Sequence, residues 1–515
     1  VYGGNDISGK IGTNETLAAT NTVPDGIEKD GENNIDKSWN AFVRISSKTK
    51  TTTTGEGDDA VTTTTVASDN QKIYIGQLFG GGNGDYDYTT AVENPYYGKS
   101  APNLARTYLE IMGGSIVYAF GGGNNATVTD KTVIHVDNPS EVVNSIIDTS
   151  NPKANTDAKK GTVGELLTTE RFRNEMGINT GFSYPSSGEF QIGSFFGGNN
   201  TAPMAIRPTW NLMGGKIRNL YSGGNKGMMT STEGLLLEIP ASSTLIADNV
   251  YGGCRMADVN PGGNNSTVEN LAGYAFPEGF SARVLIRGGD INNVYGGNDV
   301  SGKVFGGNAV GIYTSIRGDV YGGGNGSYPY TDNASLKDDD IFGDLYYNPS
   351  DVPGVSSSVE ALNAIRPNAE QVSIHLLGTE SKPTIIHGGV YLGGNSATIT
   401  TIKTDMNEPT VELKIGSHVI ADNVFLGNNG ENMVTKDILK HYAYGVDSDG
   451  KVVTTGGTDF STIDLTTKTA METYMAGATM ELKPSVVFDT DYQEYTSYFG
   501  SFFCGGNVGS LYQTL

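Results

Sequence analysis

The chain has 515 residues, of which 71 are Gly, 37% are apolar and only 18% are charged, and its net charge is -23. This composition is too glycine-rich and too uncharged for an average globular enzyme and indicates a repetitive architecture. The glycines have no collagen period, no apolar run is long enough for a membrane span, and the negative charge argues against nucleic acid and against anionic bilayers.

The chain opens inside a repeat. Residues 1–11 (VYGGNDISGKI) return at residues 294–304 (VYGGNDVSGKV) with only Ile/Val exchanges, which preserve an aliphatic position that faces inward. No signal peptide or start Met precedes the first copy. We therefore expect a fragment that was cut from a larger polypeptide at both ends.

An anchor recurs along the whole chain: an apolar residue, an aromatic residue and a short Gly run that Asn usually closes. The shortest clean intervals, Phe196 to Tyr221 and Tyr295 to Tyr321, are 25 and 26 residues. A unit of about 25 residues therefore explains the spacing. The twelve anchor aromatics are Tyr2, Phe79, Phe120, Phe196, Tyr221, Tyr251, Tyr295, Phe305, Tyr321, Tyr391, Phe425 and Phe503.

Each unit contains short strands that glycine corners separate. Residues 283–289 (RVLIRGG) and 290–298 (DINNVYGGN) show the pattern, and residues 209–221 and 107–120 repeat it. Strands this short cannot bury their apolar faces alone, whereas stacked units pair them around a shared core. The sequence predicts an all-β chain folded over residues 1–515 as one right-handed parallel β-helix of roughly 12 coils.

The Asn that closes each corner is predicted to stack as an amide ladder that satisfies turn backbone groups, with a ligand-binding role as the alternative. The aromatic before the glycines is likewise predicted to form a packing ladder, the alternative being a stripe that stacks on sugars. The expected ladder residues are Asn5, Asn83, Asn124, Asn199, Asn225, Asn298, Asn308, Asn325, Asn395 and Asn507.

Long insertions interrupt the coils, and function is expected there because solenoids display specific surface on their corners. Within them, residues 48–70 are predicted to form a β-hairpin or a mobile loop, and residues 165–176 and 361–371 to form short helices. The insertions span about 12–38, 46–70, 137–190, 255–280, 326–370 and 430–500.

Parallel β-helices include pectate lyases and polygalacturonases, whose chemistry needs converging carboxylates or calcium beside a base. The polygalacturonase motifs are absent, and residues 386–389 (IHGG) are the nearest fragment. Two acidic groups could form a weak Ca²⁺ site, although an acidic run is usually a solvated surface, and no other cofactor is expected. The candidates are Asp338, Asp339 and Asp340 in one group, and Asp489, Asp491 and Glu494 in the other.

Three smaller motifs have structural interpretations. Residues 80–88 (GGGNGDYDY) are similar to a calcium-roll nonapeptide, but a single copy favours a corner turn. Residues 317–319 (RGD) spell a cell-attachment tripeptide, yet they take the place of residues 287–290 in the preceding coil and are interpreted as a contracted corner. Cys254 and Cys504 are too few for a disulfide framework and are predicted to be buried thiols.

The phrase V-Y-G-G-G-N, with strand-Gly-Gly-strand units between its copies, resembles the large extracellular β-helix repeat proteins of Bacteroidota. Many of these look like exported surface or adhesin-like proteins, so the resemblance implies an extracellular or bacterial cell-surface location. It supplies no catalytic residue. We expect a non-enzymatic surface rod whose insertions contact glycans, host material or copies of itself. The alternatives are a polysaccharide lyase or hydrolase of the pectin-degrading type and a subunit of an extracellular filament.

Overall fold

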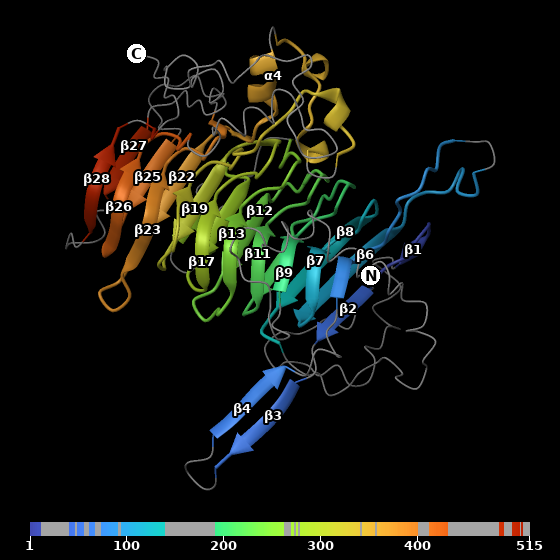
Figure 1. The fold of residues 1–515 in the computed structure, drawn as a ribbon, viewed down its shortest axis with the longest axis horizontal. Helices are drawn as coiled ribbons and strands as arrows, with labels where there is room; N and C mark the ends of the chain where they lie inside the picture. Colours follow the sequence, from blue (N-terminus) through green and yellow to red (C-terminus); the bar gives the residue numbers. More distant parts are fainter. Residues whose placement is uncertain are drawn as a thin grey trace. The chain divides into compact units, whose positions relative to one another are not determined.

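The fold is all-β, with long parallel sheets and little helix (Figure 1). This arrangement is compatible with a β-helix or another solenoid. The computed structural model describes residues 1–11, 41–46, 49–55, 61–66, 74–90, 94–139, 191–261, 269–271, 274–276, 279–339, 342–355, 358–399, 411–430, 484–488, 497–504 and 506–507.

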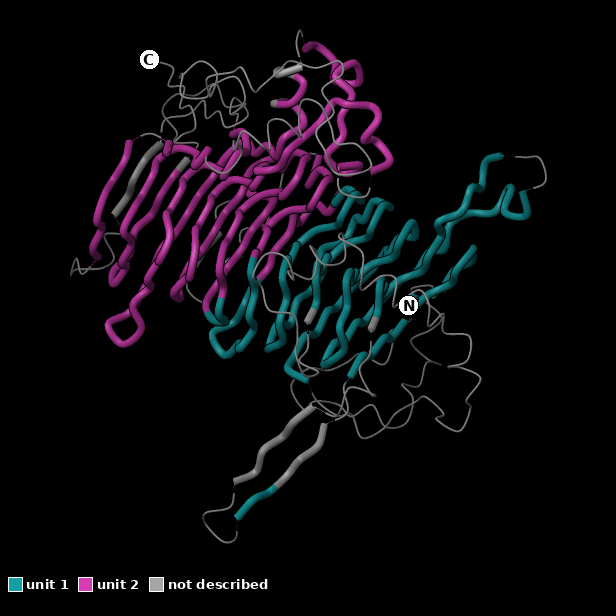
Figure 2. The backbone as a smooth tube through the Cα atoms, viewed as in Figure 1, with its two compact units in different colours: residues 1–229, 238–248, 288–290 teal, residues 230–237, 249–287, 291–515 magenta. Residues whose placement is uncertain are grey.

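The chain divides into two compact units, which have different colours in Figure 2. Unit 1 comprises residues 1–229, 238–248 and 288–290, and unit 2 comprises residues 230–237, 249–287 and 291–515. The strands β12 (Leu235–Ile239) and β13 (Ile246–Tyr251) contain residues of both units.

Unit 1 is built on two parallel sheets. The first runs in the order β5 (Tyr74–Phe79), β7 (Ser115–Phe120), β9 (Gln191–Phe196) and β11 (Lys216–Tyr221). The second runs in the order β1 (Lys10–Ile11), β6 (Asn103–Met112), β8 (Thr127–Val136) and β10 (Thr209–Leu212), and β2 (Ala41–Ser46) also pairs with β6.

Unit 2 contains three sets of parallel strands. The first is β17 (Asp290–Tyr295), β20 (Val320–Tyr321), β23 (Thr384–Tyr391), β26 (Val419–Phe425) and β28 (Tyr498–Phe503). The second is β16 (Ala282–Ile286), β19 (Asn308–Ile312), β22 (Val372–Leu376), β25 (Val411–Ile415) and β27 (Pro484–Phe488). The third is β18 (Lys303–Val304), β21 (Asn368–Ala369) and β24 (Thr398–Ile399).

The remaining elements lie in the expected insertions. The antiparallel hairpin of β3 (Thr49–Thr54) and β4 (Val61–Val66) confirms the prediction for residues 48–70, and β14 (Glu269–Leu271) pairs with β15 (Tyr274–Phe276) in the same way. The helical turns are η3 (Ala334–Leu336), η4 (Gly343–Leu345), η5 (Pro349–Asp351) and the helix α4 (Ser358–Ile365).

Two expected insertions are shorter than the sequence suggested, and one predicted helix is shifted. Strand β27 lies inside the range 430–500 yet pairs with β25, and Val259 forms a parallel bridge with Val304. Helix α4 begins before residue 361 and ends at Ile365, because Pro367 excludes its preceding residue from helical geometry. The helix expected at residues 165–176 lies outside the described residues.

A column of stacked aromatic rings follows the first sheet of each unit, as the sequence predicted. The ring centroids are 4.6 to 4.9 Å apart in both columns, which matches the spacing of paired strands. The columns are Tyr2, Phe79, Phe120, Phe196 and Tyr221 in unit 1, and Tyr251, Tyr295, Tyr321, Tyr391, Phe425 and Phe503 in unit 2.

Phe305 is the one anchor aromatic outside these columns. It follows β18 in the third set of strands, where the Lys303 ammonium lies 4.7 Å from its ring centroid. Gly306 and Gly307 then take φ values of +88° and +124°, so this corner has its own backbone path although its letters match the motif. The prediction that Phe305 marks an equivalent coil position is therefore wrong.

In two corners the neighbouring repeat requires that the second residue be glycine. A Cβ at Gly122 would lie 1.9 Å from the Oδ1 atom of Asn199, and a Cβ at Gly253 would lie 2.0 Å from Oδ1 of Asn298. These amide oxygens enter the corner to accept hydrogen bonds from the N–H groups of Gly123 and Cys254, both at 2.8 Å. Larger residues would displace a buried hydrogen bond.

The thiols differ in exposure, because Cys254 is buried and Cys504 is exposed. The prediction of two buried thiols is thus wrong for Cys504, which lies just beyond β28, the last described strand of its sheet, where no further described strand covers it. None of the helices in the described ranges is long and apolar enough to cross a membrane.

Candidate functional site: two equivalent tyrosine corners

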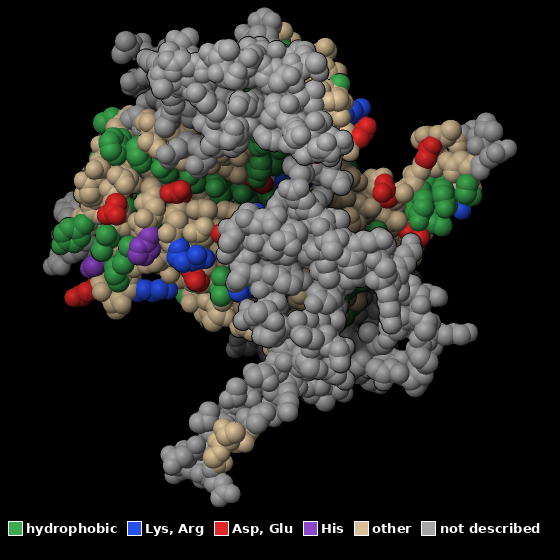
Figure 3. Space-filling view, viewed as in Figure 1, with side chains coloured by type: hydrophobic (Ala, Val, Ile, Leu, Met, Phe, Trp, Pro, Cys, Tyr) green, Lys and Arg blue, Asp and Glu red, His purple; other side chains and the backbone are tan. Residues whose placement is uncertain are grey.

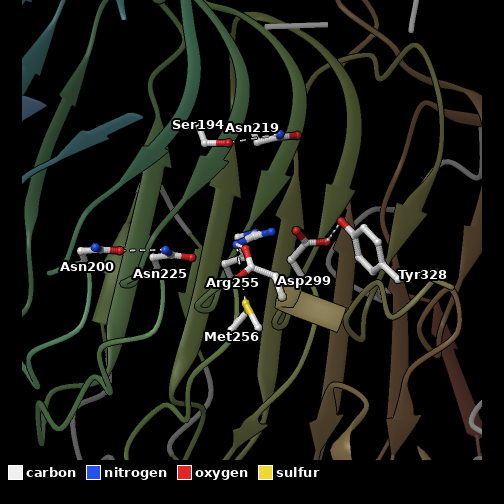
Figure 4. A network of polar contacts seen from close by, with 9 residues as sticks. Ser194, Asn200, Asn219, Asn225, Arg255, Met256, Asp299 and Tyr328 are labelled. Carbon is white, nitrogen blue, oxygen red and sulfur yellow. Dashed lines mark hydrogen bonds and ion pairs between the residues drawn. The ribbon is translucent and has the colours of Figure 1, made fainter. Parts of the chain in front are cut away.

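Side-chain amides form a hydrogen-bonded ladder along each unit. The Nδ2 group of each Asn donates to the Oδ1 atom of the rung before it, over 2.7 to 2.8 Å in unit 1 and 2.9 to 3.0 Å in unit 2. Figure 4 shows one such pair, Asn200 and Asn225. The rungs are Asp6, Asn83, Asn124, Asn200 and Asn225 in unit 1, and Asp299, Asn325, Asn395, Asn429 and Asn507 in unit 2.

Six of the ten expected ladder residues are rungs, and the other four are not. Asn5, Asn199 and Asn298 precede the rung by one residue, and Asn199 and Asn298 serve the glycine corners instead. Asn308 lies buried at the start of β19, where its Nδ2 group donates to the carbonyl of Gly322 at 3.1 Å. A rung is the fourth residue after a stacked aromatic, whatever the length of the glycine run.

The direction of the ladder explains why each described ladder begins with an acid. An interior rung must donate to one neighbour and accept from the other, which an amide can do. The first rung only accepts, so Asp6 and Asp299 suit it. The corresponding position after Tyr251 is Arg255, whose guanidinium forms an ion pair with Asp344 at 2.9 Å.

The first rung of unit 1 also holds a pair of tyrosines. One Asp6 oxygen accepts from the Asn83 amide at 2.8 Å, and the other accepts from the hydroxyl of Tyr86 at 2.8 Å. The hydroxyl of Tyr88 donates to the carbonyl of Ile7. The two tyrosine rings lie edge to face, with centroids 6.5 Å apart.

Unit 2 contains the same set of partners, although both donors share the Oδ1 atom of Asp299. Asp299 accepts from the Asn325 amide at 2.9 Å and from the hydroxyl of Tyr328 at 2.7 Å, a contact drawn in Figure 4. The hydroxyl of Tyr330 donates to the carbonyl of Val300, and the rings lie edge to face at 6.3 Å. We call these two groups the tyrosine corners: Asp6, Ile7, Asn83, Tyr86 and Tyr88 in unit 1, and Asp299, Val300, Asn325, Tyr328 and Tyr330 in unit 2.

The chain returns to the sheet at equivalent places after each corner. The N–H group of Asn103 donates to the carbonyl of Gly9 at 3.0 Å, and that of Asn368 donates to the carbonyl of Gly302 at 3.1 Å. Lys10 pairs with Asn103 and Lys303 with Asn368 in parallel register. The two corners are therefore copies of one supersecondary module.

The modules differ in the segment between the second tyrosine and the return. In unit 2 this is residues 331–366, whose described residues cover the corner so that Tyr330 is only 1% exposed. Burial, and then the charge of Asp299, raises the pKa of Tyr328 well above its usual value. The buried cluster consists of Val300, Tyr330, Leu336, Phe342, Leu345, Tyr347, Ala361 and Leu362.

In unit 1 the segment is residues 89–101, and it leaves Tyr86 and Tyr88 partly exposed. The pKa of Tyr86 is raised chiefly by its hydrogen bond to Asp6, whereas burial is the main cause for its counterpart Tyr328. Tyr97, in the same segment, is 55% exposed. The same anchor thus presents a covered surface in one unit and an open one in the other.

The loop of the open corner is held by its own contacts. The Asp87 carboxylate accepts from the N–H groups of residues 89–90 at 2.8 and 3.1 Å. The ring of Tyr96 packs on Tyr86 with centroids 4.4 Å apart, and the Lys99 ammonium lies 5.8 Å from the Tyr96 centroid. Residues 80–88 therefore form a corner turn, and the described aromatic residues of the following loop pack on it.

The acidic calcium candidates are only partly described. Asp338 and Asp339 lie between η3 and η4, and the Oδ1 atom of Asp339 accepts from the N–H group of Phe342 at 2.9 Å, which closes a turn. No cluster of three or more His, Cys, Asp or Glu side chains suited to a metal occurs within the described ranges. The candidates outside those ranges are Asp340, Asp489, Asp491 and Glu494.

The Arg-Gly-Asp tripeptide, residues 317–319, is part of a corner. The Asp319 carboxylate accepts from the N–H group of Gly389 at 2.7 Å and from the hydroxyl of Tyr321 at 2.9 Å. Its own N–H group donates to Oδ1 of Asn293 at 2.9 Å. Both carboxylate oxygens already bond within the fold, as the interpretation as a contracted corner requires.

The tyrosine corners combine aromatic faces with carboxylates, a set of groups suited to binding cations or sugars. No protein-family model, curated protein or solved structure matches this chain. The corners were visible in the sequence only as a second repeat, since residues 80–88 (GGGNGDYDY) and 322–330 (GGGNGSYPY) share their glycines, Asn and both tyrosines.

Proposed function

We propose that the chain is part of a non-enzymatic extracellular or cell-surface protein, built as a right-handed parallel β-helix of about 25 residues per coil. The coils serve as a scaffold, and segments inserted at the corners make the contacts with glycans, host material or other copies. The observation that carries this proposal is the pair of tyrosine corners, which hold different segments on the same anchor.

An anchor that keeps its geometry while its insertion changes is what a display scaffold needs. The two insertions differ in length and in what they bury, yet the anchoring hydrogen bonds are nearly equal. The Asn amide bonds measure 2.8 and 2.9 Å and the Tyr hydroxyl bonds measure 2.8 and 2.7 Å. The hydrogen bonds of each anchor offset the conformational entropy that is lost when its loop is ordered. The sequence between the anchors is therefore free to vary.

The acidic side chains in the described coils support a scaffold more than a catalyst. Asp6, Asp299 and Asp319 each accept hydrogen bonds from the fold itself, so each of these carboxylates has a structural role. On the described part of the face in Figure 3, acidic and basic side chains are interspersed and no large region carries one sign. The pectin-degrading alternative rests on fold analogy alone.

A loop exchange tests the proposal. Replacing residues 331–366 with residues 89–101 in the full chain is expected to give a folded protein, because both ends of the graft meet the same anchor. Binding to a glycan array and to host extracellular matrix should change with the loop, while circular dichroism stays that of the parent. The reverse exchange is the matched control.

Two results would count against the proposal. If both exchanges leave every binding signal unchanged, the corner segments are not the contact surfaces. If the parent chain cleaves pectin or another acidic polysaccharide with turnover, the enzymatic alternative replaces it.

A further inference from the structure

In unit 2 a buried arginine occupies the covered tyrosine corner. Arg366 is 1% exposed, its guanidinium carbon lies 5.6 Å from the ring centroid of Tyr330, and its Nη1 group donates to the carbonyl of Ser396 at 3.5 Å. Burial raises the pKa of Tyr330, the charge of Arg366 lowers this pKa, and the charge of Asp299 raises it. An aromatic face, a carbonyl and a nearby carboxylate thus accept a guanidinium out of water.

Unit 1 contains the counterpart of each of these groups. Tyr88 corresponds to Tyr330, and Asp6 corresponds to Asp299. The carbonyl of Asn125 corresponds to that of Ser396, since a Cβ at Gly84 would lie 2.6 Å from the former and a Cβ at Gly326 would lie 2.5 Å from the latter.

Unit 1 has no guanidinium at the position equivalent to Arg366. The residue before the return to the sheet is Arg366 in unit 2 and Ala101 in unit 1. Ala101 has no side chain that could reach the ring of Tyr88, and the described cation of this loop, Lys99, lies over Tyr96 instead.

The electrostatics of the open corner favour a cation. Partial burial raises the pKa of Tyr88, and the negative charges of Asp6 and Asp85 add to this increase. Asp85 is exposed, and the whole chain carries a net charge of -23, so a positively charged partner would be attracted toward this surface.

We infer that the open tyrosine corner of unit 1 binds an arginine side chain presented by a partner polypeptide. The guanidinium lies over Tyr88 and donates to the carbonyl of Asn125, as Arg366 does at the corresponding groups of unit 2, and the Asp6 carboxylate beside the tyrosines supplies a negative charge. A planar guanidinium is preferred to an ammonium because it stacks on the ring while its edge donates hydrogen bonds. The inference goes beyond the display function, because it names the chemistry of one contact.

The test uses the full chain and a fluorescent peptide with the sequence of residues 361–369 (ALNAIRPNA). Fluorescence anisotropy is expected to show saturable binding of this peptide. Replacing the peptide's arginine with neutral, isosteric citrulline should weaken binding at least about tenfold, and replacing it with lysine should weaken it to a smaller degree.

Three variants of the chain locate the site. Tyr88→Ala should weaken binding at least about tenfold, and Ala101→Arg should abolish it because the new side chain fills the site from within. Tyr97→Ser changes an exposed ring of the same loop outside the site and should leave binding unchanged. Circular dichroism of each variant checks that the fold is retained.

Several outcomes overturn the inference. Binding that survives the citrulline exchange or the Ala101→Arg change shows general attraction to an acidic surface. An absence of peptide binding at millimolar concentration rules out the site. If a neutral glycan binds in a Tyr88-dependent way and the peptide does not, the corner is a sugar platform and the display function stands without the arginine site.

Discussion

The direction of the amide ladder can be tested by reversing one rung. Asn395 is 4% exposed, donates to Oδ1 of Asn325 at 3.0 Å and accepts from Nδ2 of Asn429 at 3.0 Å. Asn395→Asp keeps the shape and the acceptor but places oxygen against oxygen where the donor was. Among the described rungs, Asp occurs only where a rung has nothing to donate to, so this position should reject it.

The cost follows from the chemistry of the rung. A lost hydrogen bond that leaves a buried acceptor unsatisfied costs about 1 to 3 kcal/mol. Ionisation adds about 1.4 kcal/mol for each unit by which burial raises the pKa of the new carboxyl above its unfolded value of about 3.9. A destabilisation of roughly 3 kcal/mol at neutral pH is therefore expected.

The penalty should depend on pH in a definite direction. The folded pKa of the new carboxyl is raised, so the ionic part of the cost is absent below pH of about 4, where both states are protonated. It grows as the pH rises from the unfolded pKa to the folded pKa and is constant above. A protonated carboxyl can also donate to Asn325, which reduces the remaining cost in acid.

Hydrogen exchange measured by mass spectrometry on the full chain suits this test, because a long repeat protein need not unfold in one step. Amides of residues 391–396 should exchange faster in Asn395→Asp by about two orders of magnitude at neutral pH. Asp6→Asn is the control: its amide oxygen can still accept from Asn83, and the contact to Tyr86 that it loses lies at an exposed position, so protection should change much less. Equal protection in the two variants would refute the directional argument.

Three further changes probe other parts of the fold. Gly122→Ala places a Cβ 1.9 Å from Oδ1 of Asn199 and should lower the melting temperature clearly, whereas an unchanged melting curve would show that the corner can open. Arg255→Ala removes the ion-pair partner of the half-buried Asp344, so limited proteolysis should cut residues 342–355 faster than in the parent; equal cleavage would mean that the ion pair does not hold the insertion. The pKa of Tyr328 is raised by folding, so its contribution to stability is complete below pH of about 10 and is lost as the pH rises further. Tyr328→Phe should therefore lose less stability than the parent in alkaline denaturant titrations, and identical pH profiles would contradict this.

The sequence predicted the parallel sheets and the aromatic columns because both depend on a local pattern that repeats. Alternating aliphatic residues and glycine corners specify short strands, and an aromatic at a constant place before each corner must stack when strands pair in register. The hairpin at residues 48–70 followed from its two threonine runs. None of these inferences requires knowledge of which repeats are neighbours.

The rungs of the ladder were harder to predict. Their place is set by distance from the strand end, so Asp6, Asn200 and Asp299 are rungs although the Asn before each of them closes the Gly-Gly-Asn motif. Phe305 and Asn308 carry the motif but come after β18 in the third set of strands, and the two glycines between them take positive φ values. Strand pairing, which the sequence motif does not specify, decides which residues are rungs and which corner lies outside the columns.

The sequence by itself determined the repeat, the strands and the residues available at each tyrosine corner. Only the tertiary structure decided that one corner is covered and the other open, because this depends on how residues 331–366 pack over Tyr330. In the sequence, Arg366 and Ala101 each simply precede a proline. Only the packing shows that the guanidinium of Arg366 lies on a buried ring. Burial of that charge arises from contacts between distant segments, and no local pattern encodes it.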